Sequence, residues 1–343
     1  MPQDFNLPQS RALRAYLGGL EVEGRMQTAL VGMPRDFWER DWIRYLFDEV
    51  ALDVVEACDC VFTQPSILLL SDSDGRHATA ARRLLGAFAV RSTPVCLVHL
   101  SDEYCACPID FYRQAGFVVR NYYRPSAAKL SHCLHVPLGY KAGFTAGLVP
   151  RPISERRNAW FFAGEVKGRR RGMLTAANRV PNGRAVITAR WDDPNGLSTE
   201  AYAQGLADAV YAPCPRGNDS VDSFRVWEAL EAGAIPIVED DGAFDAILCR
   251  ASVPATVRSW IPRDRGRVRY RALFGPSYWG GMFGTNFPVP RIRRWQRFPE
   301  MIARADPVHL SRQATEWWNA VKQQSRHQIR VGLAAMLRTS GLP

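Results

Sequence analysis

No apolar run in the sequence approaches the ~20 residues that a membrane-spanning helix needs. Residues 1–20 also lack the continuous apolar stretch of a secretory signal peptide. Zinc-finger, RNP-like and basic-zipper patterns are missing too, which argues against a nucleic-acid-binding module. We therefore expect a chain that is soluble as given and that does not bind nucleic acid.

The sequence has eight cysteines, but their spacing does not define a metal site. Two C-x-C pairs, Cys58/Cys60 and Cys105/Cys107, lack the paired C-x-x-C spacing of structural zinc. Three more cysteines lie in apolar, strand-like runs, where the thiol is usually buried: Cys96, Cys133 and Cys214. We expect no metal and buried free thiols, with a disulfide of Cys105 or Cys107 in an oxidising compartment as the alternative.

Acidic residues are fewer than basic ones, with 34 Asp and Glu against 44 Lys and Arg and a formal net charge of +10. Arginine dominates, and its guanidinium group binds phosphate and carboxylate in a bidentate manner. This balance suits an anionic substrate, or peripheral association with an acidic membrane surface. With 343 residues, 47% of them hydrophobic, the chain can build one large core or two ordinary ones.

Strands and helices alternate along the chain, which predicts an α/β fold with doubly wound parallel sheets. In the first half we expect strands at 27–31, 66–70, 94–100, 117–123 and 135–140, and helices at 36–50 and 78–89. The first of these helices should bury Phe37, Trp38, Ile43, Leu46 and Phe47.

A second alternation begins after residues 141–157, which are rich in Gly, Pro and Arg and predict a boundary between domains 1–150 and 151–343. We expect strands at 159–163, 185–189, 210–213, 235–238 and 252–257, and helices at 168–179, 198–207 and 308–338. Residues 258–295 are irregular and aromatic-rich, as in an acceptor groove or a packed surface loop.

The stretch 210–241 reads as strand, polar loop, helix, turn and strand. Ligands bind beyond the carboxyl ends of parallel strands, where this loop lies. Ser220 and Ser223 at the helix N-terminus, with Arg216 and Arg225, form a candidate anion site. Glu228 could reach a ribose hydroxyl. The alternative is an ordinary helix with solvated charges, capped by one of three residues: Asp219, Ser220 or Asp222.

The run CPRGNDSVDSFRVWEALEAGAIPIV, residues 214–238, resembles the donor-binding signature of exostosin-like glycosyltransferases. Upstream, residues 158–164 and the arginines at 169–171 resemble that family's strand, F-x-G and basic-helix element. Together they cover roughly residues 155–241. The run from His99 to Glu103 is similar to the ribitol xylosyltransferase branch. The resemblance implies a GT-B architecture, with two Rossmann-like domains facing a cleft.

By this resemblance the substrates are a nucleotide sugar, such as UDP-xylose or another UDP-sugar, and a glycan or polyol-phosphate acceptor. Fixed cations would neutralise the diphosphate, so that neither a metal nor another cofactor is needed. The resemblance also implies an inverting reaction. The implied donor-binding residues are Gly164, Arg169, Arg171, Arg216, Gly217, Ser220, Ser223, Arg225 and Glu228. The expected compartment is the cytoplasm, or the Golgi lumen if an anchor is missing from this chain.

A general base would take the proton of the attacking acceptor hydroxyl. Asp102 and Glu103 follow a predicted buried strand, and we rank Glu103 first, with His99 and Asp72 in reserve. The alternative for the pair is a helix cap or a salt bridge. The D-x-D run 72–74 could bind a metal, but we expect it to cap the next helix.

Two other classes of function remain open at this stage. A GT-B-fold sugar-nucleotide epimerase would release free nucleotide without an acceptor, and a non-catalytic homologue would bind glycan or nucleotide without turnover. The spacing of Arg225 and Glu228 argues against the second, because a site without activity has no physical need for it. Product analysis with and without acceptor separates the two enzymes.

Overall fold

The computed structural model describes residues 25–31, 37–47, 51–56, 65–168, 170–190, 193–240 and 277–339. They fall into two compact units. The first unit contains residues 1–137, 243–286 and 322–343, and the second contains 138–242 and 287–321. The division lies before the predicted boundary at residue 150. One reason is that the backbone N–H of Lys141 donates a hydrogen bond to Glu228 in the second unit.

The sheet of the first unit is parallel throughout, in the order β2-β1-β3-β4-β5-β6. Its strands are β1 (Arg25–Val31), β2 (Ala51–Glu56), β3 (Ser66–Ser71), β4 (Val95–Leu100), β5 (Phe117–Arg120) and β6 (Cys133–His135). The prediction missed β2. It was also wrong to extend a strand to residue 140, because β6 ends at His135 and the nearby Pro137 has no N–H for a sheet hydrogen bond.

The described helices of the first unit are α2 (Arg40–Leu46), α3 (Ala78–Val90) and α9 (Tyr278–Phe283), with 3₁₀ turns η1 (Asp110–Gln114) and η2 (Ala127–Lys129). α3 and η1 cover one sheet face, where Leu85 packs with Leu70 and Leu97. Trp38 is 53% exposed, so its predicted burial is wrong. α9 lies in the stretch predicted as irregular, and Ser277 caps it by accepting a hydrogen bond from the N–H of Gly280.

The sheet of the second unit is also parallel, in the order β11-β10-β9-β7-β8. Its strands are β7 (Asn158–Glu165), β8 (Gly183–Thr188), β9 (Ala209–Cys214), β10 (Ile235–Glu239) and β11 (Arg291–Ile292). The chain runs from β7 to β8 on one side, then crosses to β9 on the other side of β7. The strand order therefore reverses between β7 and β9, which is where ligands bind in open parallel sheets.

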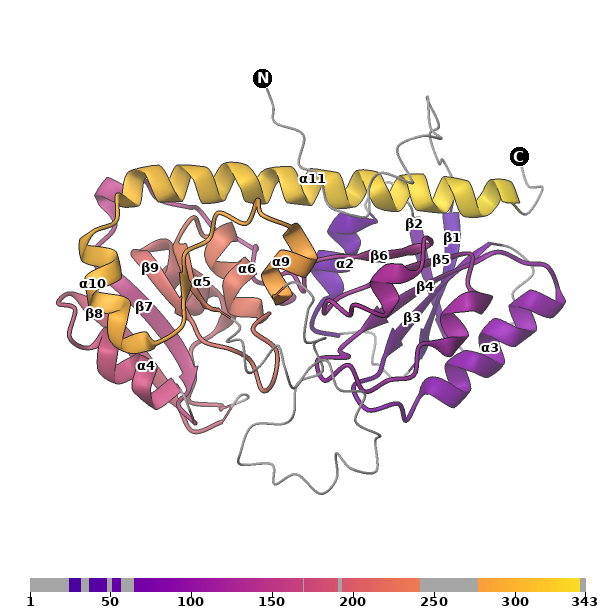
Figure 1. Cartoon of the computed structure of the whole chain (residues 1–343), viewed down its shortest axis with the longest axis horizontal. Helices are drawn as coiled ribbons and strands as arrows, with labels where there is room; N and C mark the ends of the chain where they lie inside the picture. The colour runs from indigo at the N-terminus through magenta and orange to yellow at the C-terminus, as the bar shows by residue number, and fades with distance from the viewer. Residues whose placement is uncertain are drawn as a thin grey trace. The chain divides into compact units, whose positions relative to one another are not determined.

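Helices cover both faces of this second sheet (Figure 1). They are α4 (Arg170–Ala177), α5 (Thr199–Ala207), α6 (Phe224–Glu231) and α10 (Phe298–Ala303), with the turns η3 (Ile153–Glu155) and η5 (Trp295–Arg297). Phe162 of β7 packs with α4 and α10, whereas its neighbour Phe161 packs against α5. Gly205 permits this approach, because a Cβ there would lie 2.5 Å from the Phe161 ring. The predicted fold class, α/β with doubly wound parallel sheets, is confirmed.

The longest helix, α11 (Pro307–Thr339), is drawn in yellow in Figure 1. Its residues up to Val321 belong to the second unit and the rest to the first. The apolar residues predicted to form its buried face are buried: Trp317, Trp318, Val321, Ile329 and Leu333. The ring of Trp227 on α6 stacks with the Trp317 ring of α11 and is tilted against the Trp318 ring. Among the described helices, none has the length and hydropathy to cross a membrane.

Some expectations lie outside the described residues. They are the strand at 252–257, the first part of the irregular stretch, and the residues Cys58, Cys60 and Arg169.

Candidate functional site

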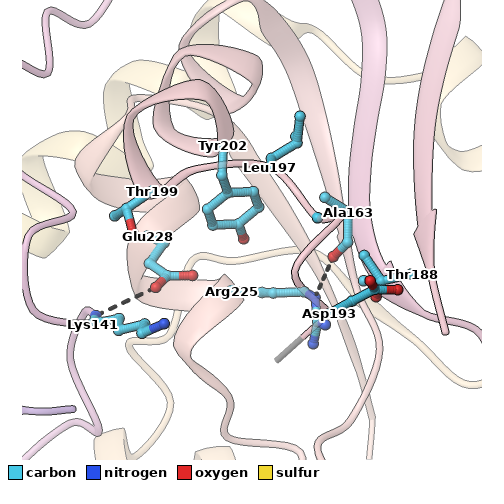
Figure 2. A pocket seen from close by; sticks show the side chains of 11 residues that line it. Lys141, Ala163, Thr188, Asp193, Leu197, Thr199, Tyr202, Arg225 and Glu228 are labelled. Atoms are coloured by element: carbon cyan, nitrogen blue, oxygen red, sulfur yellow. Dashed lines mark hydrogen bonds between the residues drawn. The ribbon is translucent and has the colours of Figure 1, made fainter. Parts of the chain in front are cut away.

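A cavity opens at the carboxyl ends of β7 and β8 and beside the first turns of α5 and α6, in the second unit (Figure 2). It measures about 720 Å³, counting the part open to solvent. Its polar lining comes from Lys141, Thr188, Asp193, Thr199, Tyr202, Arg225 and Glu228. The cavity therefore lies where the strand order reverses, as expected for a ligand site of this fold.

Arg225, in the first turn of α6, is the cation at the centre of this cavity. It is buried, and its Nε donates a 3.3 Å hydrogen bond to the carbonyl of Ala163 at the end of β7. Its guanidinium carbon lies 5.2 Å from the centre of the Phe162 ring. Gly164 makes room for it: φ is +139° there, and a Cβ would lie 2.5 Å from Nη2 of Arg225. The charge is therefore held in one place by the end of β7.

Glu228 follows Arg225 by three residues and lies on the same face of α6. Its carboxylate accepts a 3.3 Å hydrogen bond from the backbone N–H of Lys141. Burial raises the pKa of Glu228 to about 7, although this hydrogen bond, the charge of Arg225 and the hydroxyl of Tyr202 all favour the ionised form. The site thus contains a buried carboxylate that changes charge near neutral pH.

The remaining wall carries an aromatic ring and a second carboxylate. The Tyr202 ring lies 5.9 Å from the Phe144 ring and 6.0 Å from the Phe161 ring, measured between centroids. Asp193 accepts hydrogen bonds from the N–H groups of Ala189 and Asn195, which lower its pKa. The cavity can therefore offer cations to an anionic group and carboxylate oxygens to hydroxyl or N–H donors.

Three of the nine residues predicted to bind a donor line this cavity: Gly164, Arg225 and Glu228. Arg171 is exposed on α4, and the cavity lining does not include it. The loop residues Gly217 and Ser220 pair with each other, the N–H of the first donating to the carbonyl of the second at 2.8 Å. Sequence spacing therefore found the α6 residues but not the full lining.

The predicted Arg216 forms a buried salt bridge with Glu239 at the end of β10. Glu239 also accepts a 2.9 Å hydrogen bond from Nε1 of Trp295. Arg170, which was not among the predicted donor-binding residues, donates to the carbonyls of Arg216 and Gly217 at 3.1 and 3.3 Å. These arginines fix the loop between β9 and α6 and do not line the cavity.

The start of α6 differs from the prediction. Its N-cap is Ser223 rather than Asp219, Ser220 or Asp222, so the predicted cap is wrong. Ser223 is buried, and its Oγ has no hydrogen-bond partner among the described residues. Asp222 accepts a 2.6 Å hydrogen bond from Nε1 of Trp227 instead. This bond ties the loop to the helix one turn further on.

Asp102, the second candidate base, is fully buried and pairs with Arg120 at 3.1 Å and with Arg124 at 3.4 Å. Its other oxygen accepts from the N–H groups of Ala106 and Cys107. These bonds match the alternative of a salt bridge that also closes a turn. Glu103 is half-buried beside it, and its role as a base stays a prediction.

The reserve candidates are also held by structural contacts. His99 is buried, with Nδ1 2.6 Å from the Tyr112 hydroxyl, and burial lowers its pKa to about 4. Asp72 accepts from the N–H groups of Gly75 and His77 and so closes the turn before α3. The N-cap of α3 is His77, without a side-chain cap hydrogen bond, so the predicted capping is wrong. Among the described residues no group of three or more His, Cys, Asp and Glu side chains is placed to hold a metal. Of the five described cysteines, all but Cys105 are buried.

Sequence reasoning missed Lys141, Asp193 and Tyr202 in the cavity. Asp193 follows a predicted strand, so the rule for strand ends could have found it. Lys141 lies in the segment that we assigned to a domain boundary, and Tyr202 lies in a helix with no distinguishing pattern. For these two only the three-dimensional contacts carry the signal.

No family model matches the chain, and no curated protein is significantly similar to it. Among solved structures, an α1,3-fucosyltransferase is similar with a TM-score of 0.37 and 9% identity, over 66% of this chain and 72% of that chain. An α-glucosyltransferase in complex with UDP is similar with a TM-score of 0.43 and 10% identity, over 86% and 95%. The α-glucosyltransferase in complex with UDP-glucose and DNA containing an abasic site is similar with a TM-score of 0.39 and 11% identity, over 86% of this chain and 95% of that chain.

At these identities and TM-scores the likenesses do not define an activity. The resemblance to the exostosin-like family stays a prediction. The expectation that nucleic acid is not a partner also stays a prediction.

Proposed function

We propose that this protein is a glycosyltransferase that binds a nucleotide-sugar donor in the cavity of the second unit and transfers the sugar to a glycan or polyol-phosphate acceptor. One observation carries the proposal: Arg225 and Glu228 stand on one face of α6, in a cavity where the strand order reverses. A cation and a carboxylate three residues apart suit the two polar parts of a nucleotide, its diphosphate and its ribose.

In this proposal Arg225 and Lys141 balance the charge that develops on the nucleotide diphosphate as the bond to the sugar breaks. Arg225 suits the task because its contacts with Ala163 and Phe162 already fix it, so little reorganisation is needed. Glu228 would accept hydrogen bonds from the ribose hydroxyls. The resemblance implies a UDP-sugar, such as UDP-xylose, and fixed cations make a metal-independent reaction the natural expectation.

The acceptor hydroxyl must lose a proton as it attacks the anomeric carbon, with inversion there as the resemblance implies. Glu103 is our proposed general base. Asp102, with both oxygens held by Arg120 and backbone N–H groups, would position the turn that carries it. This assignment rests on the sequence and not on a described contact with the cavity.

The test is calorimetric binding of UDP, GDP and several nucleotide sugars, with and without divalent metal. Loss of a charged hydrogen bond predicts that Arg225→Ala weakens nucleotide binding by about 10- to 100-fold. Arg179→Ala is the matched control, because it removes an exposed arginine of the same unit that lies outside the cavity. If folded wild-type protein binds no nucleotide, or if both variants bind equally well, the proposal is wrong. Product analysis with and without acceptor then separates transferase from epimerase.

A further inference from the structure

Charged or titratable groups from four segments act on Glu228. Arg225 lies on its own helix, Tyr202 on α5, Cys214 on β9 and Lys141 on the segment that leads into the second unit. Burial raises the pKa of the Cys214 thiol, so it stays neutral. The N–H of Lys141, the hydroxyl of Tyr202 and the charge of Arg225 all favour the ionised carboxylate, and burial opposes them.

We infer that donor binding requires the ionised form of Glu228, and that Tyr202 is a positioning residue that keeps this carboxylate ionised and aimed into the cavity. The inference rests on the proposed function, because it assigns a proton-linked switch to the same donor site. Its geometric basis is that both side chains line one cavity and that the Tyr202 hydroxyl points into it, toward α6 (Figure 2).

The dependence on ionisation follows from how a carboxylate binds the two neighbouring hydroxyls of a ribose. Two ribose hydroxyls each donate a proton, and an ionised carboxylate accepts both in charge-assisted hydrogen bonds. A protonated carboxyl carries a donor of its own and accepts fewer. The ligand therefore binds the ionised state more tightly and must drive off the proton when it binds at low pH.

The sign of the pH effect follows from the raised pKa. With a value of about 7 in the free protein, Glu228 is almost fully ionised at pH 8 and mostly protonated at pH 6. Affinity should therefore be constant above about pH 8 and fall roughly tenfold between pH 8 and pH 6. Both phosphates of a nucleotide sugar are diesters, so the probe itself has no phosphate that titrates near neutral pH.

Tyr202→Phe keeps the ring between Phe144 and Phe161 and removes only the hydroxyl. Without that group the ionised carboxylate loses stabilisation, so the midpoint of the pH profile should move up by about half to one pH unit. A purely structural role would weaken binding equally at every pH. Tyr211→Phe is the matched control, because its buried hydroxyl has no hydrogen-bond partner among the described residues.

The experiment is calorimetry from pH 5.5 to 9 on wild type, Tyr202→Phe, Tyr211→Phe and Glu228→Gln. The probes are UDP-glucose and the nucleotide sugar that binds best in the panel above. We expect a tenfold fall for wild type, an upward shift for Tyr202→Phe only, and a flat profile for Glu228→Gln. A flat wild-type profile, or equal midpoints for the two Tyr variants, overturns the inference while the proposed function stands. Absence of nucleotide binding at every pH overturns both.

Discussion

A Cβ atom at Gly164 would lie 2.5 Å from Nη2 of Arg225, closer than a Cβ atom approaches a non-bonded neighbour. The glycine also has φ of +139°, which other residues adopt only with strain. The end of β7 and the first turn of α6 can therefore approach this closely only because residue 164 has no side chain. This relationship makes the position of the central cation testable without touching the cation itself.

We expect Gly164→Ala to displace Arg225 and to weaken nucleotide binding at least tenfold, while lowering the free energy of unfolding by about 1–3 kcal/mol from backbone strain. Calorimetry and urea unfolding measure the two effects. Gly172→Ala on α4 is the control, because a Cβ there meets no atom within 4 Å. It should stabilise the protein by about 0.5–1 kcal/mol and leave binding unchanged. Equal binding by both variants would contradict the fitted arrangement.

Neighbouring arginines on α4 should behave in opposite ways. Arg170 is buried and donates to the carbonyls of Glu165, Arg216 and Gly217, whereas Arg171 is exposed. Arg170→Ala leaves these carbonyls without their donor, so we expect a loss of about 2–3 kcal/mol in the free energy of unfolding. Arg171→Ala should change stability by less than about 0.5 kcal/mol.

The same pair tests the sequence-based choice of donor residues. Nucleotide affinity should fall severalfold for Arg170→Ala, because the loop between β9 and α6 loses its anchor, and stay within twofold for Arg171→Ala. Calorimetry on both variants measures this. A large loss with Arg171→Ala would show that the exposed guanidinium reaches the ligand after all, as the resemblance implied.

The periodic part of the fold could be predicted from sequence because each element carries its own pattern. Buried parallel strands such as β3 have a continuous apolar centre, and α11 shows its five apolar residues at helical spacing. β2, with its acidic residues, and the short α9, with its two glycines, have no such pattern and were missed. Their formation depends on neighbours that are far away in the chain.

The same distinction between local pattern and distant packing applies to the residues of the site. Arg225 and Glu228 lie one turn apart on one helix, so their spacing alone places them together. Lys141 and Tyr202 reach the cavity only through the packing of distant segments. Conversely, Arg216 was predicted to bind an anion, whereas its partner is Glu239. The two residues lie 23 positions apart, so no local pattern indicates that they pair. An ion pair between separate strand ends is invisible until the sheet is known.

Asp102 and Glu103 are adjacent, yet we expect their removal to affect different properties. Asp102→Asn leaves Arg120, which is fully buried, without its counter-charge, and should cost about 3–5 kcal/mol in the free energy of unfolding. Glu103→Gln should change stability by less than about 1 kcal/mol but lower the transfer rate by roughly 10²- to 10⁴-fold, as for loss of a general base. Urea unfolding and initial rates measure the two effects. A full rate for Glu103→Gln would remove it as the base.

Burial of Glu39 should make the free energy of unfolding depend on pH. It is 4% exposed, and burial raises its pKa from 4.5 to about 7, with Nδ2 of Asn121 as a hydrogen-bond donor at 3.5 Å. The pKa of Glu39 is higher in the folded state than in the unfolded state. Its contribution to the free energy of unfolding is therefore fully present below about pH 4.5 and is lost as the pH rises through 7. The whole difference amounts to about 3 kcal/mol, since each pKa unit is worth about 1.4 kcal/mol.

Glu39→Gln removes this titration and keeps the size of the side chain. We therefore expect the variant to match wild type near pH 4.5 and to be more stable at pH 8, by up to about 3 kcal/mol. Urea unfolding of both proteins at pH 4.5, 6 and 8 measures the difference between their free energies of unfolding. The titration of all other groups cancels in this difference. Glu155→Gln, the same substitution at an exposed position, is the control. If Glu39→Gln were less stable than wild type at pH 8, the carboxylate would be stabilising the fold and its pKa would not be raised.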